Sequence, residues 1–127
     1  MTYPLRRVGD TFAVARLAPS EGWPWWATRS AFASVTRTPD ETSVVCDATL
    51  VPTTVRAERG FALYVVDGPL PFDAVGVLAS LVAPLAAAGI SILSVSTFDT
   101  DYLLVPEPDL SRAHEAWRLA GHEVRER

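Results

Sequence analysis

The stretch from Asp67 to Val105 constrains the fold of this chain more than any other part of it. In order, it predicts the end of a strand, a helix that stops at Gly89, and two strands joined by a tight connection. Asp73 is the predicted N-cap of the helix, and Gly89 supplies the left-handed residue after it. An apolar stripe at helical spacing consists of Val75, Leu78, Leu81, Val82 and Leu85. We therefore expect a helix that packs on the sheet to which these strands belong.

The rest of the chain predicts further strands and one more full helix. Residues 61–66 are apolar on both faces, which is typical of a central strand covered on both sides. Prolines within 18–26 and 47–57 leave room for no more than short helical turns. Pro108–Asp109 opens the second helix, which ends before Gly121. The other predicted strands are residues 11–17, 31–38, 41–46, 90–95 and 102–105, with 122–125 as an edge strand.

The two halves of the chain carry a repeated pattern. Three segments of the first half recur in the second at one constant shift of about 60 residues. They are Ala33–Thr36, Glu41 and Val44–Val45, with counterparts Leu93–Ser96, Asp101 and Leu104–Val105. Such a repeat predicts two tandem ferredoxin-like βαββαβ units, an α+β fold with helices packed on antiparallel sheets. Because both helix positions of the first copy are short and broken by proline, we expect an abridged unit in residues 1–60 and a complete one in residues 61–127.

Composition and charge exclude several classes of partner. The chain has 127 residues and a net charge of −4, and its arginines are scattered apart from Arg6–Arg7 and a pair at the C-terminal end. Nucleic-acid affinity comes mostly from clustered basic side chains, so no nucleic-acid partner is expected. The longest apolar run, residues 75–88, is interrupted and too short to span a bilayer, and no signal peptide is evident. We expect a soluble, cytoplasmic protein without a membrane partner.

Metal, cofactor and catalytic motifs are lacking. Cys46 is the single cysteine, which excludes an intrachain disulfide and a multi-cysteine zinc site, and its apolar surroundings predict a small buried side chain. The two histidines have no metal-ligand spacing: His114 is predicted on a solvated helix face and His122 in a turn. Neither a G-x-S-x-G elbow nor a phosphate-binding loop occurs. We therefore predict no metal, no cofactor and no catalytic residue.

The second half carries motifs that resemble a known family. Its most specific segment is STFDTDYLLV, residues 96–105, supported by Gly68–Leu70, Phe72, Gly76 and Gly89–Ser91. These residues resemble tandem ACT-type proteins, in the branch that includes the cytosolic arginine sensors of animals, called CASTOR, and many small bacterial proteins. The first half, SVTRTPDETSVV, is a weaker match. The resemblance implies a βαββαβ regulatory protein that binds amino acids between modules.

The resemblance also implies where a ligand would bind. Carried over by position, the ligand-binding residues are Gly76, Val77, Thr97, Phe98, Thr100 and Asp101. Gly76 allows close approach to the backbone, where free N–H groups suit a carboxylate, and Asp101 could pair with an ammonium or guanidinium group. Phe98 could cover an aliphatic stem. Two simpler explanations stay open: Gly76 could serve close helix–sheet packing, and Asp101 could be an ordinary turn residue.

Three functions remain in order of preference. The first is a non-catalytic regulatory or sensor protein whose ligand is an amino acid, arginine-like or another. The arginine sensors place their site between two complete modules, and this chain has one, so the resemblance implies a homodimer. The second is an interaction or dimerisation module without a ligand, to which Trp23, Trp25 and Trp26 would contribute an aromatic contact. A small enzyme comes third.

Overall fold

The computed structural model describes residues 2–126, which divide into two compact units. The larger unit comprises residues 2–8 and 62–126, and the smaller unit comprises Gly9–Phe61. The strands are β1 (Pro4–Leu17), β2 (Ser34–Arg37), β3 (Thr42–Asp47), β4 (Arg56–Val66), β5 (Leu93–Ser96), β6 (Asp101–Pro106) and β7 (Glu123–Arg125). The helices are α1 (Val77–Ala87) and α2 (Leu110–Leu119), with short 3-10 helices η1 (Trp25–Arg29), η2 (Ala48–Leu50) and η3 (Glu107–Asp109). The fold is α+β.

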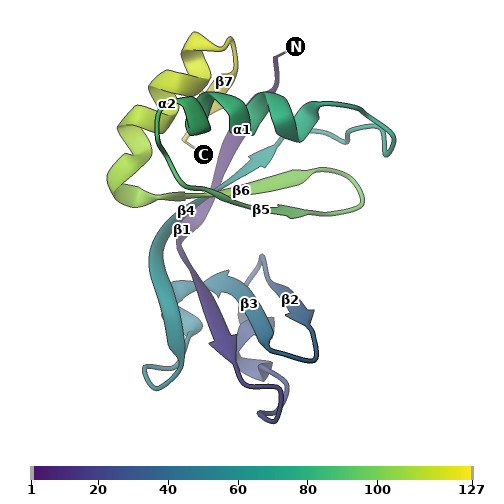
Figure 1. Cartoon of the computed structure of the whole chain (residues 1–127), viewed down its shortest axis with the longest axis vertical. Coiled ribbons are helices and arrows are strands. Elements are labelled where there is room, and N and C mark those ends of the chain that lie inside the picture. Colours follow the sequence, from purple (N-terminus) through teal and green to yellow (C-terminus); the bar gives the residue numbers. More distant parts are fainter. Residues whose placement is uncertain (1, 127) are drawn as a thin grey trace. The chain divides into compact units, whose positions relative to one another are not determined.

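The larger unit contains the complete order of elements that the sequence predicts for the second half. From β4 onward the chain forms β4, α1, β5, β6, α2 and β7, which is the βαββαβ order. Its strands lie in the order β7-β1-β4-β6-β5, and β5 pairs antiparallel with β6 (Figure 1). Both helices contribute to one core with alternate residues of β4 and β6, so they cover the same face of the sheet.

The first part of β1 also belongs to the larger unit, which differs from the expected division at residue 60. Leu5 is buried in that core, and β1 runs parallel to β7, with Leu5 opposite Val124. Residues 4–7 contain only one strongly apolar residue, Leu5, and Pro4 and two arginines interrupt the alternation that a strand would show. Pairing with neighbours on both sides makes it a strand, and local propensity alone does not predict it.

Helix α1 begins about one turn later than the sequence predicts. Its N-cap is Gly76 and not Asp73, and the stripe that packs on the sheet is Val77, Leu81 and Leu85. Val75, which the sequence places on that stripe, precedes the helix and is 86% exposed. At the other end Gly89 has a φ of +73°, as predicted for a left-handed terminator.

Replacing Gly76 by alanine is expected to lower the free energy of unfolding by about 1 kcal/mol, because a Cβ is disfavoured at its φ of +82°. A Cβ built at Gly76 would meet no atom within 4 Å, so the cost is conformational and not steric. Gly22 offers the matched control, since its Cβ position is also open and its φ lies outside the left-handed range. Urea unfolding would measure both variants, and equal stabilities for the two would contradict the prediction.

The smaller unit has its own core and no long helix. Antiparallel pairing joins β2 to β3 and β3 to β1, and the strand order is β2-β3-β1-β4. The 3-10 helix η2 lies within residues 47–57, where the sequence predicts a short helical turn, whereas η1 overlaps the other predicted segment, 18–26, only at Trp25 and Trp26 and extends to Arg29. Cys46 is buried in this core, as predicted, and burial raises the pKa of its thiol to about 11. Such a thiol is not reactive near neutral pH.

A hydrogen-bonded cluster in the larger unit corrects the prediction for His114. Its side chain is half-buried beside Tyr64, and the Tyr64 hydroxyl donates to Glu126 Oε2 at 2.6 Å and lies 2.6 Å from His114 Nε2. Burial lowers the pKa of His114, helped by Arg118 and Arg7 and opposed by Glu126. His122, which the sequence predicts in a turn, directly follows the turn at residues 120–121 and is buried, and its Nδ1 accepts a hydrogen bond from the Tyr3 N–H at 3.0 Å.

The melting temperature is expected to fall as the pH drops below about 6.5, in part because of His114. In the unfolded chain this imidazole titrates near 6.5, whereas its pKa in the folded protein is lower, so protons bind the unfolded state first. His114→Gln should remove this part of the pH dependence, and Glu115→Gln, at an exposed position of the same helix, should not. An unchanged pH profile in His114→Gln would show that the imidazole does not contribute.

Candidate functional site

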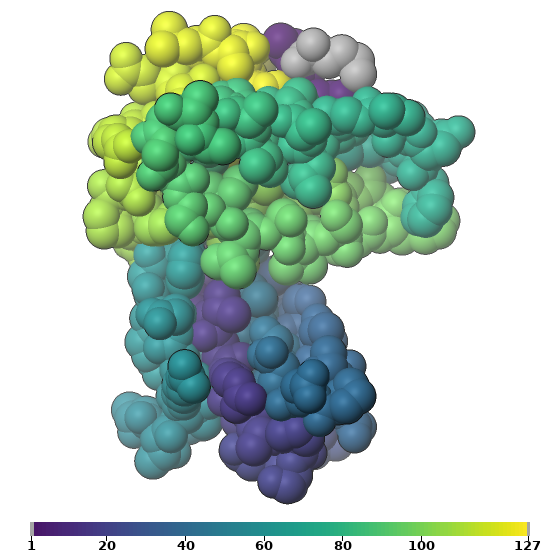
Figure 2. Space-filling model, viewed as in Figure 1, coloured from purple at the N-terminus to yellow at the C-terminus, as the bar shows by residue number. Residues whose placement is uncertain are grey.

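A pocket of about 400 Å³ lies in the larger unit where α1 begins. It is formed by the segment that precedes α1, the first turn of that helix and the turn between β5 and β6. Figures 1 and 2 show the segment before α1 in teal and the β5–β6 turn in light green at the same end of this unit. All six residues that the sequence proposes for ligand binding line this pocket: Gly76, Val77, Thr97, Phe98, Thr100 and Asp101.

The β5–β6 turn is held by its own hydroxyl groups. The Thr97 N–H donates to the Thr100 carbonyl at 2.8 Å, and the Thr97 hydroxyl donates to the same carbonyl at 3.2 Å. The Thr100 hydroxyl donates to the Val66 carbonyl at the end of β4, at 2.6 Å. Since both hydroxyl hydrogens are used, Thr97 and Thr100 can offer a ligand only oxygen lone pairs. Sequence reasoning does not reveal this restriction.

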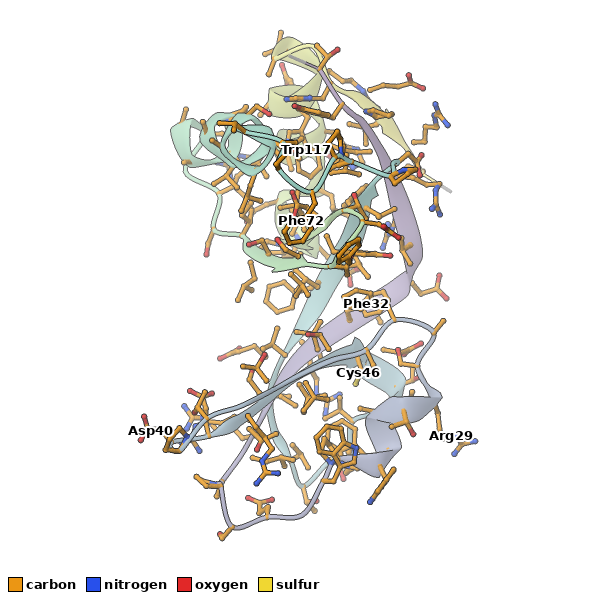
Figure 3. The ribbon with its side chains drawn as sticks, turned by 90° about the vertical axis from the view of Figure 1, so that its right-hand side faces the viewer. Arg29, Phe32, Asp40, Cys46, Phe72 and Trp117 are labelled. Carbon is orange, nitrogen blue, oxygen red and sulfur yellow. The ribbon has the colours of Figure 1, made fainter. Side chains whose placement is uncertain are left out.

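The segment before α1 is joined to this turn by a backbone hydrogen bond. The Leu70 N–H donates to the Asp99 carbonyl at 2.8 Å, and both residues line the pocket. Phe72 packs against Phe98 across the same gap, with ring centroids 5.0 Å apart and an interplanar angle of 34°. The two rings are 77% and 78% exposed, so they form an apolar rim that is not buried within the unit; Phe72 is labelled in Figure 3.

Asp101 supplies a partly exposed carboxylate to the pocket. Its Oδ1 accepts a hydrogen bond from the Ser96 hydroxyl at 2.6 Å, which fixes the orientation of the side chain. Among residues 2–126, no hydrogen bond or ion pair reaches its Oδ2. One carboxylate oxygen therefore remains available to an ammonium or guanidinium group.

The first turn of α1 supplies hydrogen-bond donors of the opposite character. The N–H groups of Val77, Leu78 and Ala79 precede the first intrahelical bond, which runs from the Ser80 N–H to the Gly76 carbonyl at 3.0 Å. These three residues line the pocket, and the helix dipole adds partial positive charge there. The open space around Gly76 contradicts the alternative that this glycine serves close helix–sheet packing.

The structure adds Phe72 and Asp99 to the residues that the sequence proposes. Phe72 lies 26 positions before Phe98 in the chain, and no spacing rule links the two. Only the clustering of aromatic and acidic residues at both ends of the stretch from Asp67 to Val105 points to them.

Between residues 2 and 126, no group of three or more His, Cys, Asp or Glu side chains could hold a metal ion. In the same part of the chain, no helix is long and apolar enough to cross a membrane.

Family models match both parts of the chain. An ACT domain model matches residues 56–118, which cover β4 to nearly the end of α2. A separate model of an N-terminal domain matches residues 10–54.

Among curated proteins, the chain is similar to the cytosolic arginine sensor for mTORC1 subunit 1 of Homo sapiens, with 47% identity over 47 residues. That match covers 37% of this chain and 14% of the human protein, so the chain spans only a small part of the curated relative.

Among solved structures, protein Atu0741 from Agobacterium tumefaciens is 38% identical, with a TM-score of 0.94 over 100% of this chain and 96% of that one. The regulatory subunit of aspartate kinase from Thermus thermophilus has a TM-score of 0.61 at 10% identity, over 92% of this chain and 94% of that one, and shares the fold. The chain therefore belongs to the same family as the Agobacterium protein, and it is an ACT-domain protein.

Proposed function

We propose that this chain is a non-catalytic regulatory protein that binds an amino acid in the pocket at the start of α1. The observation that carries the proposal is the meeting of donors and an acceptor in one pocket: N–H groups of the first helical turn and the free oxygen of Asp101. The names of the arginine sensor and of the aspartate kinase regulatory subunit favour the same class of function.

The mode of binding follows from these charges. The α-carboxylate of the ligand lies against the N–H groups of Val77, Leu78 and Ala79, where the helix dipole favours an anion. The α-ammonium group lies against Asp101, through a charge-assisted hydrogen bond. The ligand's side chain then lies along the Phe72 and Phe98 rings. A volume of about 400 Å³ is within the range of small-molecule sites.

The lining of the pocket leaves the choice of amino acid open. Val77, Leu78 and Ala79 place only apolar side chains after Gly76. An arginine side chain would therefore need Asp99 or Asp101 as its partner. We expect apolar or uncharged amino acids to compete well with arginine.

A thermal-shift screen of the purified chain against all proteinogenic amino acids tests the proposal. Binding to the folded state raises the melting temperature by mass action, by an amount that grows with ligand concentration. A rise with one or a few amino acids is expected. If none of them raises the melting temperature at millimolar concentration, the exposed aromatic residues would instead favour an interaction module without a ligand.

We also propose that the chain acts as a homodimer. Strand β5 ends the sheet order of the larger unit, and Leu93 on it is an exposed apolar residue. Phe72 and Phe98 are exposed apolar residues at the pocket itself, so a second copy placed over them would cover the bound ligand. Analytical ultracentrifugation with and without amino acids tests the dimer. A monomeric mass in both conditions would contradict it.

Finally, we propose that the smaller unit is an abridged copy of the larger one. Its elements follow the order strand, 3-10 helix, strand, strand, 3-10 helix, strand. Its β2–β3 turn is built like the β5–β6 turn: the Thr38 N–H donates to the Glu41 carbonyl at 2.9 Å, and the Thr38 hydroxyl donates to it at 3.1 Å. The last ladder pair is Arg37–Thr42 in one hairpin and Ser96–Asp101 in the other. The register of the repeat is thus 59 residues and not 60.

A further inference from the structure

A second pocket, of about 190 Å³, lies within the smaller unit. It is lined by Glu21, Gly22, Trp23 and Pro24, which precede η1, and by Arg37 and Thr42, which face each other at the base of the β2–β3 turn. Its position among the elements of its unit is that of the first pocket in the larger unit, between the segment before the first helix and the turn of the first hairpin.

The side chains at the base of this hairpin have a different charge from their counterparts in the larger unit. Arg37 occupies the position of Ser96, and Thr42 occupies the position of Asp101. A guanidinium group therefore stands where the first pocket has a hydroxyl, and a hydroxyl where it has a carboxylate. This hairpin offers an anion partner, whereas the other hairpin offers a cation partner.

Two polar side chains of the second pocket lack a protein partner. Thr42 is only 5% exposed, yet its hydroxyl makes no hydrogen bond among residues 2–126. Among residues 2–126, Thr42 Oγ1 is not one of the fully buried polar atoms without a partner, so this hydroxyl reaches the solvent of the pocket and can bond a ligand there. Arg37 is exposed, and its guanidinium makes no ion pair or side-chain hydrogen bond within the described part of the chain, so it is available to an anion.

Glu21 gives the same pocket a negative group. Its Oε1 accepts a hydrogen bond from the Ala18 N–H at 3.0 Å, which positions the carboxylate. Although Glu21 and Arg37 line one pocket, they form no ion pair with each other in residues 2–126. Opposite charges that line one small space without meeting are suited to a ligand that carries both charges.

We propose that this pocket binds a small zwitterionic amino acid, of the size of glycine or alanine. The ligand carboxylate pairs with the Arg37 guanidinium and accepts a hydrogen bond from the Thr42 hydroxyl, and the ammonium group pairs with Glu21. The Trp23 indole, 44% exposed, forms an apolar wall. The volume, about half that of the first pocket, is suited to a small ligand. This site is independent of the one proposed at α1.

Proton–nitrogen NMR spectra of the labelled chain, titrated with L-alanine and with propionate, test the proposal. We expect the Trp23 indole N–H signal to shift and saturate at millimolar alanine. Propionate, which lacks the ammonium group, should bind at least tenfold more weakly. Arg37→Gln should weaken alanine binding at least tenfold, and so should Glu21→Gln, which keeps an oxygen for the Ala18 N–H.

Matched variants separate this site from the first pocket. Arg29→Gln removes an exposed arginine of the same unit that does not line the pocket, and it should leave the alanine titration unchanged (Figure 3). Asp101→Asn, in the other pocket, should leave it unchanged as well. A Trp23 signal that does not move with alanine, or that moves equally in Arg37→Gln, would overturn the proposal. Equal binding of propionate would overturn the ligand class.

Discussion

Replacing Trp117 by alanine is expected to lower the free energy of unfolding of the larger unit by about 3–5 kcal/mol, the usual cost of removing a buried tryptophan. The indole is fully buried in the core between α1, α2 and the sheet (Figure 3). Its Nε1–H donates to the Leu81 carbonyl at 2.9 Å, and its ring packs edge-on against Tyr64 at a centroid distance of 5.4 Å. The variant therefore loses apolar packing, a buried hydrogen bond and an aromatic contact at once.

The chain offers a convenient readout and a matched control for this prediction. Trp23, Trp25 and Trp26 all lie in the smaller unit, so tryptophan fluorescence of Trp117→Ala reports that unit, while the far-ultraviolet circular dichroism of α1 and α2 reports the larger one. Trp25→Ala removes an indole that is 72% exposed and should change stability by no more than about 0.5 kcal/mol. A loss below about 1 kcal/mol in Trp117→Ala would contradict the assignment of this residue to the core.

The elements of the second half could be predicted because their signals are local. The helix stop at Gly89 and the strands on either side of Ser96–Asp101 follow from residues within a few positions of one another. The start of α1 could not be placed from the same evidence. Asp73 is a favourable N-cap residue, but Gly76 can adopt the left-handed conformation from which the chain enters the helix, and that geometry depends on the preceding segment.

Elements that depend on pairing between distant parts of the chain escaped prediction. The first part of β1 becomes a strand because β7, more than a hundred residues away, pairs with it. His114 lies at a position that its own helix pattern predicts to be solvated, yet Tyr64 and Glu126 enclose it from two other segments. If the smaller unit is a copy of the larger one, as proposed above, ladder pairing places Thr42 opposite Asp101 in the alignment, one position from the Glu41–Asp101 match that the sequence suggests.

The candidate site was more accessible to sequence reasoning than the fold boundaries. Its residues come from two short segments, and β5, which follows α1, returns the chain to the end of the sheet at which α1 begins. What the sequence could not reveal is how the polar groups are used. Thr97 and Thr100 look like ligand donors, but their hydroxyl hydrogens serve the turn and the end of β4. This leaves Asp101 as the side chain on which the proposed binding depends most.

Asp101→Asn is expected to weaken amino-acid binding by about 10- to 100-fold, the loss typical of removing the charge from a charge-assisted hydrogen bond. The substitution is isosteric, and the amide oxygen that it introduces can still accept the Ser96 hydroxyl, so the melting temperature without ligand should not change. Calorimetric titration with whichever amino acid the thermal screen identifies would measure the effect. Asp73→Asn removes an equal charge from the exposed segment before α1, outside the pocket lining, and should bind as the natural chain does. If both variants weaken binding equally, the pocket responds only to net charge. If Asp101→Asn binds the amino acid normally, Asp101 does not hold the ammonium group, and the proposed orientation of the ligand is wrong.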